Sequence, residues 1–182
     1  AEKIGYPLIV KPIAGAGSAD THRVDDKTEL EDVITKTAHV AEVSVEEFIT
    51  GREFTFDTIS VNGVPQYFNF CFYRPRPLIM RQNRWISPQT IALRDVEDPE
   101  LRPGKEMGLA VLKALKFGTG FTHMEWFLTD GGEAVFGEIG GRPPGARTVD
   151  VMNFASDIDL FRHTAEAICF GKISLQLERK YN

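Results

Sequence analysis

The sequence predicts an α+β fold, in which strands pair as antiparallel hairpins and helices lie between them. One observation is REFTFDTISVNGVPQYFNFCFY at 52–73, which alternates apolar and polar residues on both sides of Asn62 and Gly63. An Asn-Gly pair between alternating segments is the strongest short-range signal for a hairpin. The second observation is FTHMEWFLTDGGEAVFGEI at 121–139, which predicts another hairpin around a turn at Asp130, Gly131 and Gly132. A segment with helical spacing comes after each hairpin. Strands that are joined directly as antiparallel hairpins do not fit a doubly wound parallel sheet.

Length and composition limit the classes of protein that fit. The chain has 182 residues, of which 42% are apolar, enough for one compact domain or for two lobes. Its net charge of −5 argues against nucleic acid as a partner, because phosphate would require a basic face. The longest apolar stretches, such as LAVLKAL at 109–115, are too short to span a bilayer, so no membrane partner and a cytoplasmic location are expected. Cys71 and Cys169 have no metal or redox spacing and are expected to be buried, reduced thiols.

The first 50 residues predict a strand, a loop, a helix and a second strand. YPLIVKP at 6–12 is an apolar strand between prolines, and GAGSAD at 15–20 is a flexible loop. A helix is expected within 25–40, where Thr28 and Glu31 have the spacing of a capping box. The apolar residues of this helix recur at helical spacing: Leu30, Val33, Ile34 and Ala38. The opening AEKIG has the character of a helix end, so we expect a fragment that lacks a preceding N-terminal domain.

The remaining segments predict a long loop and two helices. Residues 74–97 contain five arginines and several prolines without a period, which is typical of a functional loop. A helix is expected at about 100–116, with its apolar stripe at Met107, Val111, Leu112 and Leu115. Another is expected at 157–170, capped by Gly171, with one apolar face at Ile158, Phe161, Ala165 and Ile168.

Two glutamates of the second hairpin point to a metal ion. Glu125 and Glu138 are equidistant from the predicted turn, so they should lie opposite each other with their side chains on one face. Like charges in this position destabilise a sheet, and a divalent cation would compensate them. Carboxylates without cysteine or clustered histidine favour Mg²⁺ or Mn²⁺ over Zn²⁺. The alternative is a pair of solvated glutamates on an exposed face.

A second candidate is a phosphate site beside the first strand. Lys11 ends the strand, and the loop that follows contains Gly15, Gly17 and Ser18, which can present N–H groups and a hydroxyl to phosphates. Neither a Walker loop nor a GxGxxG motif is present, so a mobile glycine loop is the alternative.

A third candidate is the corner within VEEFITGREFTFD at 45–57. The backbone groups of Glu47 and Ile49 would there be exposed to a flat ligand. An ordinary strand connection is the alternative reading of this corner.

Taken in order, four motifs resemble those of the ATP-grasp superfamily of carboxylate-amine and carboxylate-thiol ligases. They are YPLIVKP with its small-residue loop, VEEFITGREFTFD, GFTHMEWF and EIGGRPPG, and together they cover nearly the whole chain. The resemblance implies ATP between two α+β lobes with antiparallel sheets: a partial small lobe at 1–50, and a large lobe at 51–182 with the metal and phosphate site. ATP and Mg²⁺, or Mn²⁺ in its place, are the cofactors that this family would require.

The resemblance also implies a role for each matching residue. The residues expected to bind the nucleotide are Lys11, Gly15, Gly17 and Ser18 at the phosphates, Glu46, Glu47 and Ile49 at the adenine, Glu53 at the ribose, and Arg81 at the phosphates. Glu125 and Glu138 match the metal ligands, and Arg142 matches a catalytic basic residue that steadies the transferred phosphoryl group. The commoner family pattern has an asparagine ligand where this chain has Gly140, which puts a second metal ion in doubt.

Outside the motifs, four arginines of the long loop are expected to bind acidic groups: Arg74, Arg76, Arg81 and Arg84. The alternative is a solvated basic loop. His123 is expected to have a structural role, although it could point towards Glu125, and no role is assigned to Asp57, Thr148 or Asp150.

The implied activity is ATP-dependent ligation of a small-molecule carboxylate to an amine through an acyl phosphate. Two alternatives remain: an ATP-grasp module that binds nucleotide without catalysis, and an interaction domain with a chance pair of carboxylates. An incomplete first lobe would leave a strand edge exposed, which would favour a homodimer.

Overall fold

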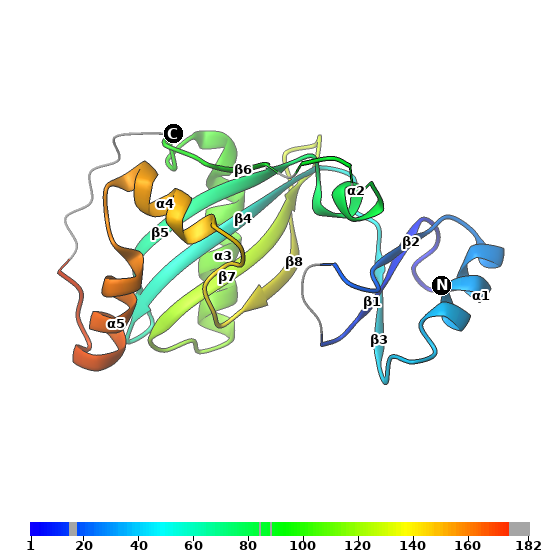
Figure 1. Ribbon diagram of the computed structural model, residues 1–182, viewed down its shortest axis with the longest axis horizontal. Coiled ribbons are helices and arrows are strands. Elements are labelled where there is room, and N and C mark those ends of the chain that lie inside the picture. Colours follow the sequence, from blue (N-terminus) through cyan, green and yellow to red (C-terminus); the bar gives the residue numbers. More distant parts are fainter. Residues whose placement is uncertain (15–17, 84, 88, 175–182) are drawn as a thin grey trace. The chain divides into compact units, whose positions relative to one another are not determined.

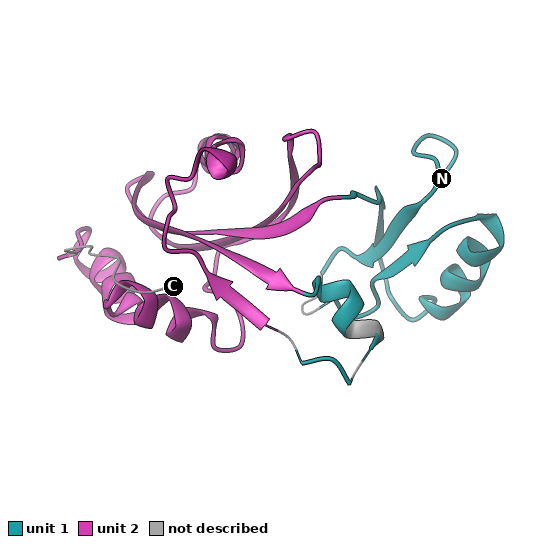
Figure 2. Cartoon of the chain, turned by 90° about the horizontal axis from the view of Figure 1, so that it is seen from above, with its two compact units in different colours: residues 1–50, 75–88 teal, residues 51–74, 89–182 magenta. Residues whose placement is uncertain are grey.

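The computed structural model describes residues 1–14, 18–83, 85–87 and 89–174, except for the side chains of Arg81 and Gln82. It confirms the α+β class, and the chain forms two compact units (Figures 1 and 2). Unit 1 consists of residues 1–50 and 75–88, and unit 2 of residues 51–74 and 89–182. Residues 75–88 therefore group with the first unit, whereas the predicted division placed them in the second lobe.

Unit 1 is built on a small antiparallel sheet with the strand order β2-β1-β3. Its elements are β1 (Leu8–Pro12), β2 (His22–Val24), α1 (Lys27–Lys36), β3 (Val43–Glu47) and α2 (Pro77–Gln82). The sheet buries Leu8, Val10 and Val24 against Val33 of α1. Since side chains alternate along a strand, Lys11 lies on the other face of β1 from this core.

The N-cap of helix α1 lies two residues before the start of the predicted capping box. Asp26 is the N-cap and accepts a hydrogen bond from the backbone N–H of Glu29, whose carboxylate accepts one from the N–H of Asp25. The spacing is the one expected, but it starts at Asp26 instead of Thr28, because the earlier acidic residue satisfies the first free N–H groups. Val33 faces the core as expected, whereas Ile34 is 58% exposed.

Unit 2 is built on an antiparallel sheet with the strand order β6-β5-β4-β7-β8. Its strands are β4 (Arg52–Val61), β5 (Val64–Arg74), β6 (Gln89–Ala92), β7 (Gly120–Leu128) and β8 (Ala134–Gly140). Both predicted hairpins are confirmed. In the first, Val61 pairs with Val64 around Asn62 and Gly63, which have φ values of 49° and 81° as a two-residue hairpin turn requires.

Residues 74–97 are not one long loop. This segment contains helix α2 and strand β6, which pairs with the end of β5. Both elements are short, at six and four residues, so neither repeats its period often enough to be recognised in the sequence.

Helices cover the two faces of the five-stranded sheet (Figure 1). Helix α3 (Arg102–Ala114) follows the short 3₁₀ helix η1 (Pro99–Leu101) and lies over one face, where Phe54, Phe56, Met124 and Trp126 are buried. Helices α4 (Thr148–Ser156) and α5 (Leu160–Phe170) cover part of the other face, where they pack on residues near the β4–β5 turn, such as Ile59 and Phe121. Helix α4 was not predicted.

The predicted buried face of α5 is wrong, although its cap is confirmed. Leu160, His163 and Ala167 point inwards, whereas Phe161 and Ile168 are 55% and 63% exposed. Gly171 ends the helix with φ of 61°. Cys71 is buried as expected, but Cys169 on α5 is exposed, and neither cysteine is in a disulfide.

Within the described part of the chain, no helix is both long enough and apolar enough to cross a membrane.

Candidate active site

The two predicted metal ligands lie opposite each other on neighbouring strands of unit 2. Glu125 on β7 and Glu138 on β8 are register partners. The Glu125 side chain is 28% exposed, and Glu138 is exposed. Residues that are direct partners in an antiparallel pair have side chains on the same face of the sheet. The predicted juxtaposition of the two carboxylates is therefore confirmed.

A β-bulge produces this pairing. On the turn side of the hairpin, Trp126 pairs with Phe136, while on the other side Glu125 pairs with Glu138. Gly137 is the extra residue between these pairs, and in a register without the shift Glu125 would pair with Gly137 instead of Glu138. A Cβ atom at Gly137 would lie 2.8 Å from the carbonyl oxygen of Glu125, so a glycine fits closely here. The sequence prediction reached the right pair without anticipating this bulge.

A buried histidine connects Glu125 to an aspartate on the central strand. His123 Nδ1 donates a hydrogen bond to Asp57 Oδ1 at 2.7 Å, and Nε2 lies 3.5 Å from Glu125 Oε1. His123 is 5% exposed and Asp57 is fully buried. Thr55 Oγ1 donates to the second oxygen of Asp57 at 2.5 Å. These side chains share the sheet face of Glu125, since Asp57 pairs with His123 and Thr55 pairs with Glu125.

The carboxylates around this cluster perturb its titratable groups. Burial of the His123 ring lowers its pKa, but the interactions with Asp57 and Glu125 outweigh burial and raise the pKa of His123 to about 9. Burial, followed by the charges of Glu125 and Asp57, raises the pKa of Tyr73 far above its usual value. Both shifts favour the protonated form, which is the neutral phenol for Tyr73 and the imidazolium for His123.

The polar face of unit 1 brings together two residues predicted to meet the nucleotide. Lys11 Nζ on β1 lies 3.0 Å from Glu46 Oε2 on β3, with side-chain exposures of 21% and 39%. Ser44 Oγ donates a hydrogen bond to Glu46 Oε1 at 2.8 Å. The lysine and the glutamate, expected at opposite ends of a nucleotide, form an ion pair in this structure.

The predicted adenine corner follows β3 in unit 1. The Phe48 N–H donates to the carbonyl of Pro7 at 3.2 Å, and the Ile49 carbonyl accepts from Arg76 Nη2 at 3.2 Å. The Phe48 ring also has the Arg23 and Arg76 guanidinium groups at 4.4 Å and 5.4 Å from its centroid. Arg76 thus contacts the corner itself, which the sequence prediction for this loop did not include.

The other predicted site residues are placed as follows. Glu53 is 8% exposed on β4, Glu47 is exposed at the end of β3, and Ser18 has φ of 54° in its turn. Arg142 is exposed just after β8 and donates to the Pro143 carbonyl at 2.9 Å. Gly15 and Gly17 lie outside the described residues. Arg81 is in α2, and its side chain also lies outside the described part of the structure.

The sequence prediction did not assign Thr55 and Asp57 to the site. The signal for them is the alternation in EFTFDT, which puts Glu53, Thr55 and Asp57 on one strand face and two phenylalanines on the other. An aspartate at a position that proves fully buried requires a partner. The partner, His123, lies 66 residues away in sequence, so no local pattern could reveal the pair.

The donor set suits one Mg²⁺ or Mn²⁺ ion that is completed by other ligands. Among the described residues, no three or more His, Cys, Asp or Glu side chains form a cluster able to hold a metal ion. Mg²⁺ commonly binds through one or two carboxylates together with waters and substrate phosphates. Glu125 and Glu138 fit that mode, in which the protein supplies two of the ligands.

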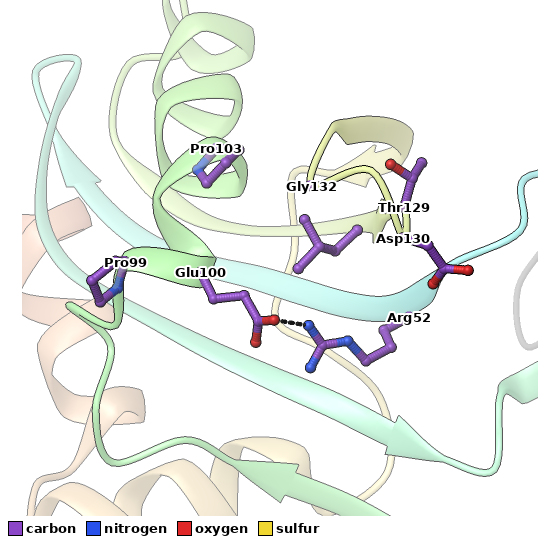
Figure 3. A pocket seen from close by; sticks show the side chains of 8 residues that line it. Arg52, Pro99, Glu100, Pro103, Thr129, Asp130 and Gly132 are labelled. Atoms are coloured by element: carbon purple, nitrogen blue, oxygen red, sulfur yellow. Dashed lines mark ion pairs between the residues drawn. The ribbon is translucent and has the colours of Figure 1, made fainter.

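A separate hollow of about 420 Å³ lies on unit 2 (Figure 3). An ion pair between Arg52 and Glu100 crosses it. None of the residues that line it was predicted to belong to the site. The lining consists of Arg52, Pro99, Glu100, Pro103, Leu128, Thr129, Asp130 and Gly132.

The antiparallel α+β architecture and the facing carboxylates place the chain among the ATP-grasp ligases in fold. The chain belongs to the family described as "D-ala D-ala ligase C-terminus", which matches residues 1–149. The L-arginine-specific L-amino acid ligase of Bacillus subtilis is 28% identical over 152 residues, which cover 78% of this chain and 35% of that protein. The D-alanine–D-alanine ligase of Fervidobacterium nodosum is 37% identical over 78 residues, which cover 42% of this chain and 25% of that protein.

Solved structures share the fold. The L-amino acid ligase from Bacillus licheniformis superposes with a TM-score of 0.73 at 24% identity, covering 92% of this chain and 40% of that protein. The D-alanine–D-alanine ligase from Bacillus anthracis, complexed with ATP, gives a TM-score of 0.60 at 21% identity, covering 92% and 49%. The chain spans 25% to 35% of the length of the two curated relatives described above.

Proposed function

We propose that this chain supplies the nucleotide-binding and metal-binding part of an ATP-dependent ligase that joins a carboxylate to an amine. The observation that carries the proposal is the pairing of Glu125 with Glu138 on one face of the β7–β8 hairpin. Family membership supports the reaction class, since the relatives named above are ligases of amino acids.

The proposed reaction has two steps, phosphorylation of the carboxylate and attack by the amine. A carboxylate oxygen of the first substrate attacks the γ-phosphorus of ATP, the bond to the β-phosphate oxygen breaks, and an acyl phosphate and ADP result. The amine nitrogen of the second substrate then attacks the acyl carbon, the bond to the phosphate oxygen breaks, and the nitrogen loses a proton. Neither step requires a covalent bond to the protein, so positioning and charge neutralisation are the main contributions expected of the chain.

The side chains of unit 2 have the charges that phosphoryl transfer needs. Glu125 and Glu138 would hold Mg²⁺, which when bound neutralises charge on the phosphates. Arg142, directly after β8, is the proposed cation for the transferred phosphoryl group, because a guanidinium matches phosphate oxygens with paired N–H donors. Its present acceptor is the carbonyl of the next residue, Pro143, in an exposed position, so it can turn to a ligand at little cost.

In unit 1, the proposed role of Lys11 is to contact the phosphates. The Lys11–Glu46 ion pair is partly exposed, and such pairs contribute only about 0–1 kcal/mol, so a nucleotide that takes both partners loses little by separating them. The backbone of Glu47 and Ile49 is proposed to meet the adenine, and Glu53 of unit 2 the ribose. Ser18, Gly15, Gly17 and Arg81 remain predicted phosphate contacts from the sequence.

The test is calorimetric titration of the protein with a non-hydrolysable ATP analogue, with and without Mg²⁺. Glu138→Gln should weaken the Mg²⁺-dependent part of binding, whereas Glu133→Gln, an exposed glutamate in the turn of the same hairpin, should not. Phosphate release with a panel of small carboxylates and amines would then identify the reaction. Binding without release across the panel would favour a non-catalytic nucleotide module, and absence of nucleotide binding would leave an interaction domain.

The substrates are proposed by class only, as a small-molecule carboxylate and an amine. The cytoplasmic location, the homodimer and the lack of a nucleic-acid or membrane partner stay predictions from the sequence.

A further inference from the structure

A continuous chain of hydrogen bonds and ion pairs crosses three strands of unit 2 and ends at Glu125. It begins on β5, where the backbone N–H of Cys71 donates to Thr55 Oγ1 at 3.2 Å. Thr55 donates to Asp57 Oδ2 at 2.5 Å, and Asp57 Oδ1 accepts from His123 Nδ1 at 2.7 Å. His123 Nε2 then faces Glu125 Oε1 at 3.5 Å. Each group in this chain is oriented by the one before it.

The burial of Asp57 and His123 makes them unusual for a structural pair. They are 0% and 5% exposed, and taking two charges out of water carries a penalty that their attraction does not reliably repay. Replacing such a pair by apolar residues is often neutral or stabilising. The same sheet face is apolar a few residues away, at Ile59 and Phe121 under α4 and α5. An apolar pair would also fit this face of the sheet, so packing alone does not account for a polar pair at positions 57 and 123.

The geometry gives them a different use. The Asp57–His123 bond fixes the plane of the imidazole ring, and the ring then holds one oxygen of the Glu125 carboxylate. Glu138 is the register partner of Glu125 on the same sheet face, so a cation between the two glutamates would take the other oxygen of the Glu125 carboxylate. Carboxylates that bind metal ions are themselves commonly hydrogen-bonded by a second layer of residues that sets their orientation.

We infer that Asp57 and His123 are positioning residues, which hold the Glu125 carboxylate in the orientation that a divalent cation shared with Glu138 requires. This inference rests on the proposed function, because it assumes that the two glutamates bind a cation. It adds two residues to the site that act through Glu125 and do not contact the cation themselves.

The measurement is the affinity for Mn²⁺, followed by the electron paramagnetic resonance signal of the free ion, with and without a non-hydrolysable ATP analogue. Asp57→Asn keeps the size of the side chain and removes the charge that anchors His123. Loss of such second-layer partners typically costs about 10- to 100-fold in metal affinity, and we expect a loss in that range. Binding of the analogue without a metal ion should stay at the wild-type level, which a general structural defect would not allow.

The matched control is Glu166→Gln on α5. Glu166 also pairs with a histidine in unit 2, with His163 Nδ1 at 3.0 Å, but that pair lies outside the described chain of contacts to Glu125. This variant should bind Mn²⁺ like the wild type. His123→Gln retains an N–H donor for Glu125, so its loss of Mn²⁺ affinity should be smaller than that of Asp57→Asn.

A second variant keeps the inference testable if Asp57→Asn does not fold. Asp57→Leu with His123→Leu removes both partners of the buried pair together, and the Thr55 hydroxyl then loses its acceptor but still accepts from the Cys71 N–H. Wild-type Mn²⁺ affinity in either folded variant would overturn the inference and leave the proposed function intact. Absence of Mn²⁺ binding by the wild-type protein would overturn the inference together with the proposed metal site.

Discussion

Replacing Gly108 with alanine should destabilise unit 2, because α3 packs on the sheet too closely for a methyl group. A Cβ atom at this position would lie 2.4 Å and 2.6 Å from two ring carbons of Phe56 and 3.2 Å from Met124 Cε. Carbon atoms pack at about 3.5–4.0 Å, so the ring would have to move by roughly 1 Å. Phe56 is 1% exposed and lies against the rings of Phe68 and Phe70, at centroid distances of 5.9 Å and 5.1 Å, so it has no free space to enter.

Two opposing contributions set the size of the effect. Overpacking a well-packed core costs about 1–3 kcal/mol, and this contact with a buried ring belongs at the upper end, about 3 kcal/mol. Alanine in the middle of a helix is more favourable than glycine by about 1 kcal/mol. The net loss is about 2 kcal/mol, which lowers the melting temperature of a chain of this length by about 4–8 °C.

Thermal unfolding followed by circular dichroism measures this loss. Ala110→Gly, at an exposed position of the same helix, isolates the helix-propensity contribution and should cost about 1 kcal/mol. Gly108 lies against the sheet face opposite to Glu125, so the folded variant should retain wild-type Mn²⁺ affinity. A higher melting temperature for Gly108→Ala than for the wild type would refute the close packing of α3 on Phe56.

Three further predictions concern the bulge, the corner and the acid limit of stability. Gly137→Ala puts a Cβ atom 2.8 Å from the backbone of β7, so it should lower the free energy of unfolding by about 1–3 kcal/mol. It should also weaken Mn²⁺ binding, because the paired carboxylates would shift. Unchanged Mn²⁺ affinity would contradict this prediction. Arg76→Lys removes the guanidinium that donates to the Ile49 carbonyl, a hydrogen bond that contributes about 1 kcal/mol. Calorimetry should therefore show about a fivefold weaker affinity for the ATP analogue. Equal affinity of the variant and the wild type would be the contrary result. Hydrogen bonds, first that from the Ser174 N–H, lower the pKa of Glu166 from 4.5 to about 2. Because this pKa is lower in the folded state, the carboxylate stabilises the protein above about pH 4.5, and the contribution is lost as the pH falls towards 2. Glu166→Gln should therefore lose less of its melting temperature between pH 5 and pH 2 than the wild type.

The hairpins and the facing glutamates could be predicted because their signals are local. Asn62 and Gly63 alone fix the first turn, and the distance of Glu125 and Glu138 from one turn fixes their pairing to within a residue. The bulge at Gly137 could not be predicted, since a glycine in a strand also fits an ordinary close approach of backbones. It decides the final register, which the prediction reached only because its estimate of the turn centre matched the bulged pairing.

Features that depend on contacts distant in sequence were predicted poorly. Helix α5 has apolar residues on more than one side, so periodicity could not decide whether Phe161 or Leu160 faces the sheet. Tertiary packing puts Leu160 inside and leaves Phe161 exposed. The Asp57–His123 pair could not be found for the same reason, because each residue alone fits an ordinary strand.

One face of the five-stranded sheet is apolar at one end and carries the proposed metal-site residues at the other. Near the β4–β5 turn, this face is apolar and lies under α4 and α5, and towards the other end of the same strands it carries Asp57, His123 and Glu125. Strands β4 and β7 are held by neighbours on both sides, so Glu125 stands on a fixed backbone with an oriented carboxylate. Glu138 is on β8, the last strand in the sheet order, and is exposed. If the two glutamates bind a cation as proposed, Glu125 on its fixed strand would set the position of the cation, and Glu138 on the edge strand would adjust to the cation and its phosphates.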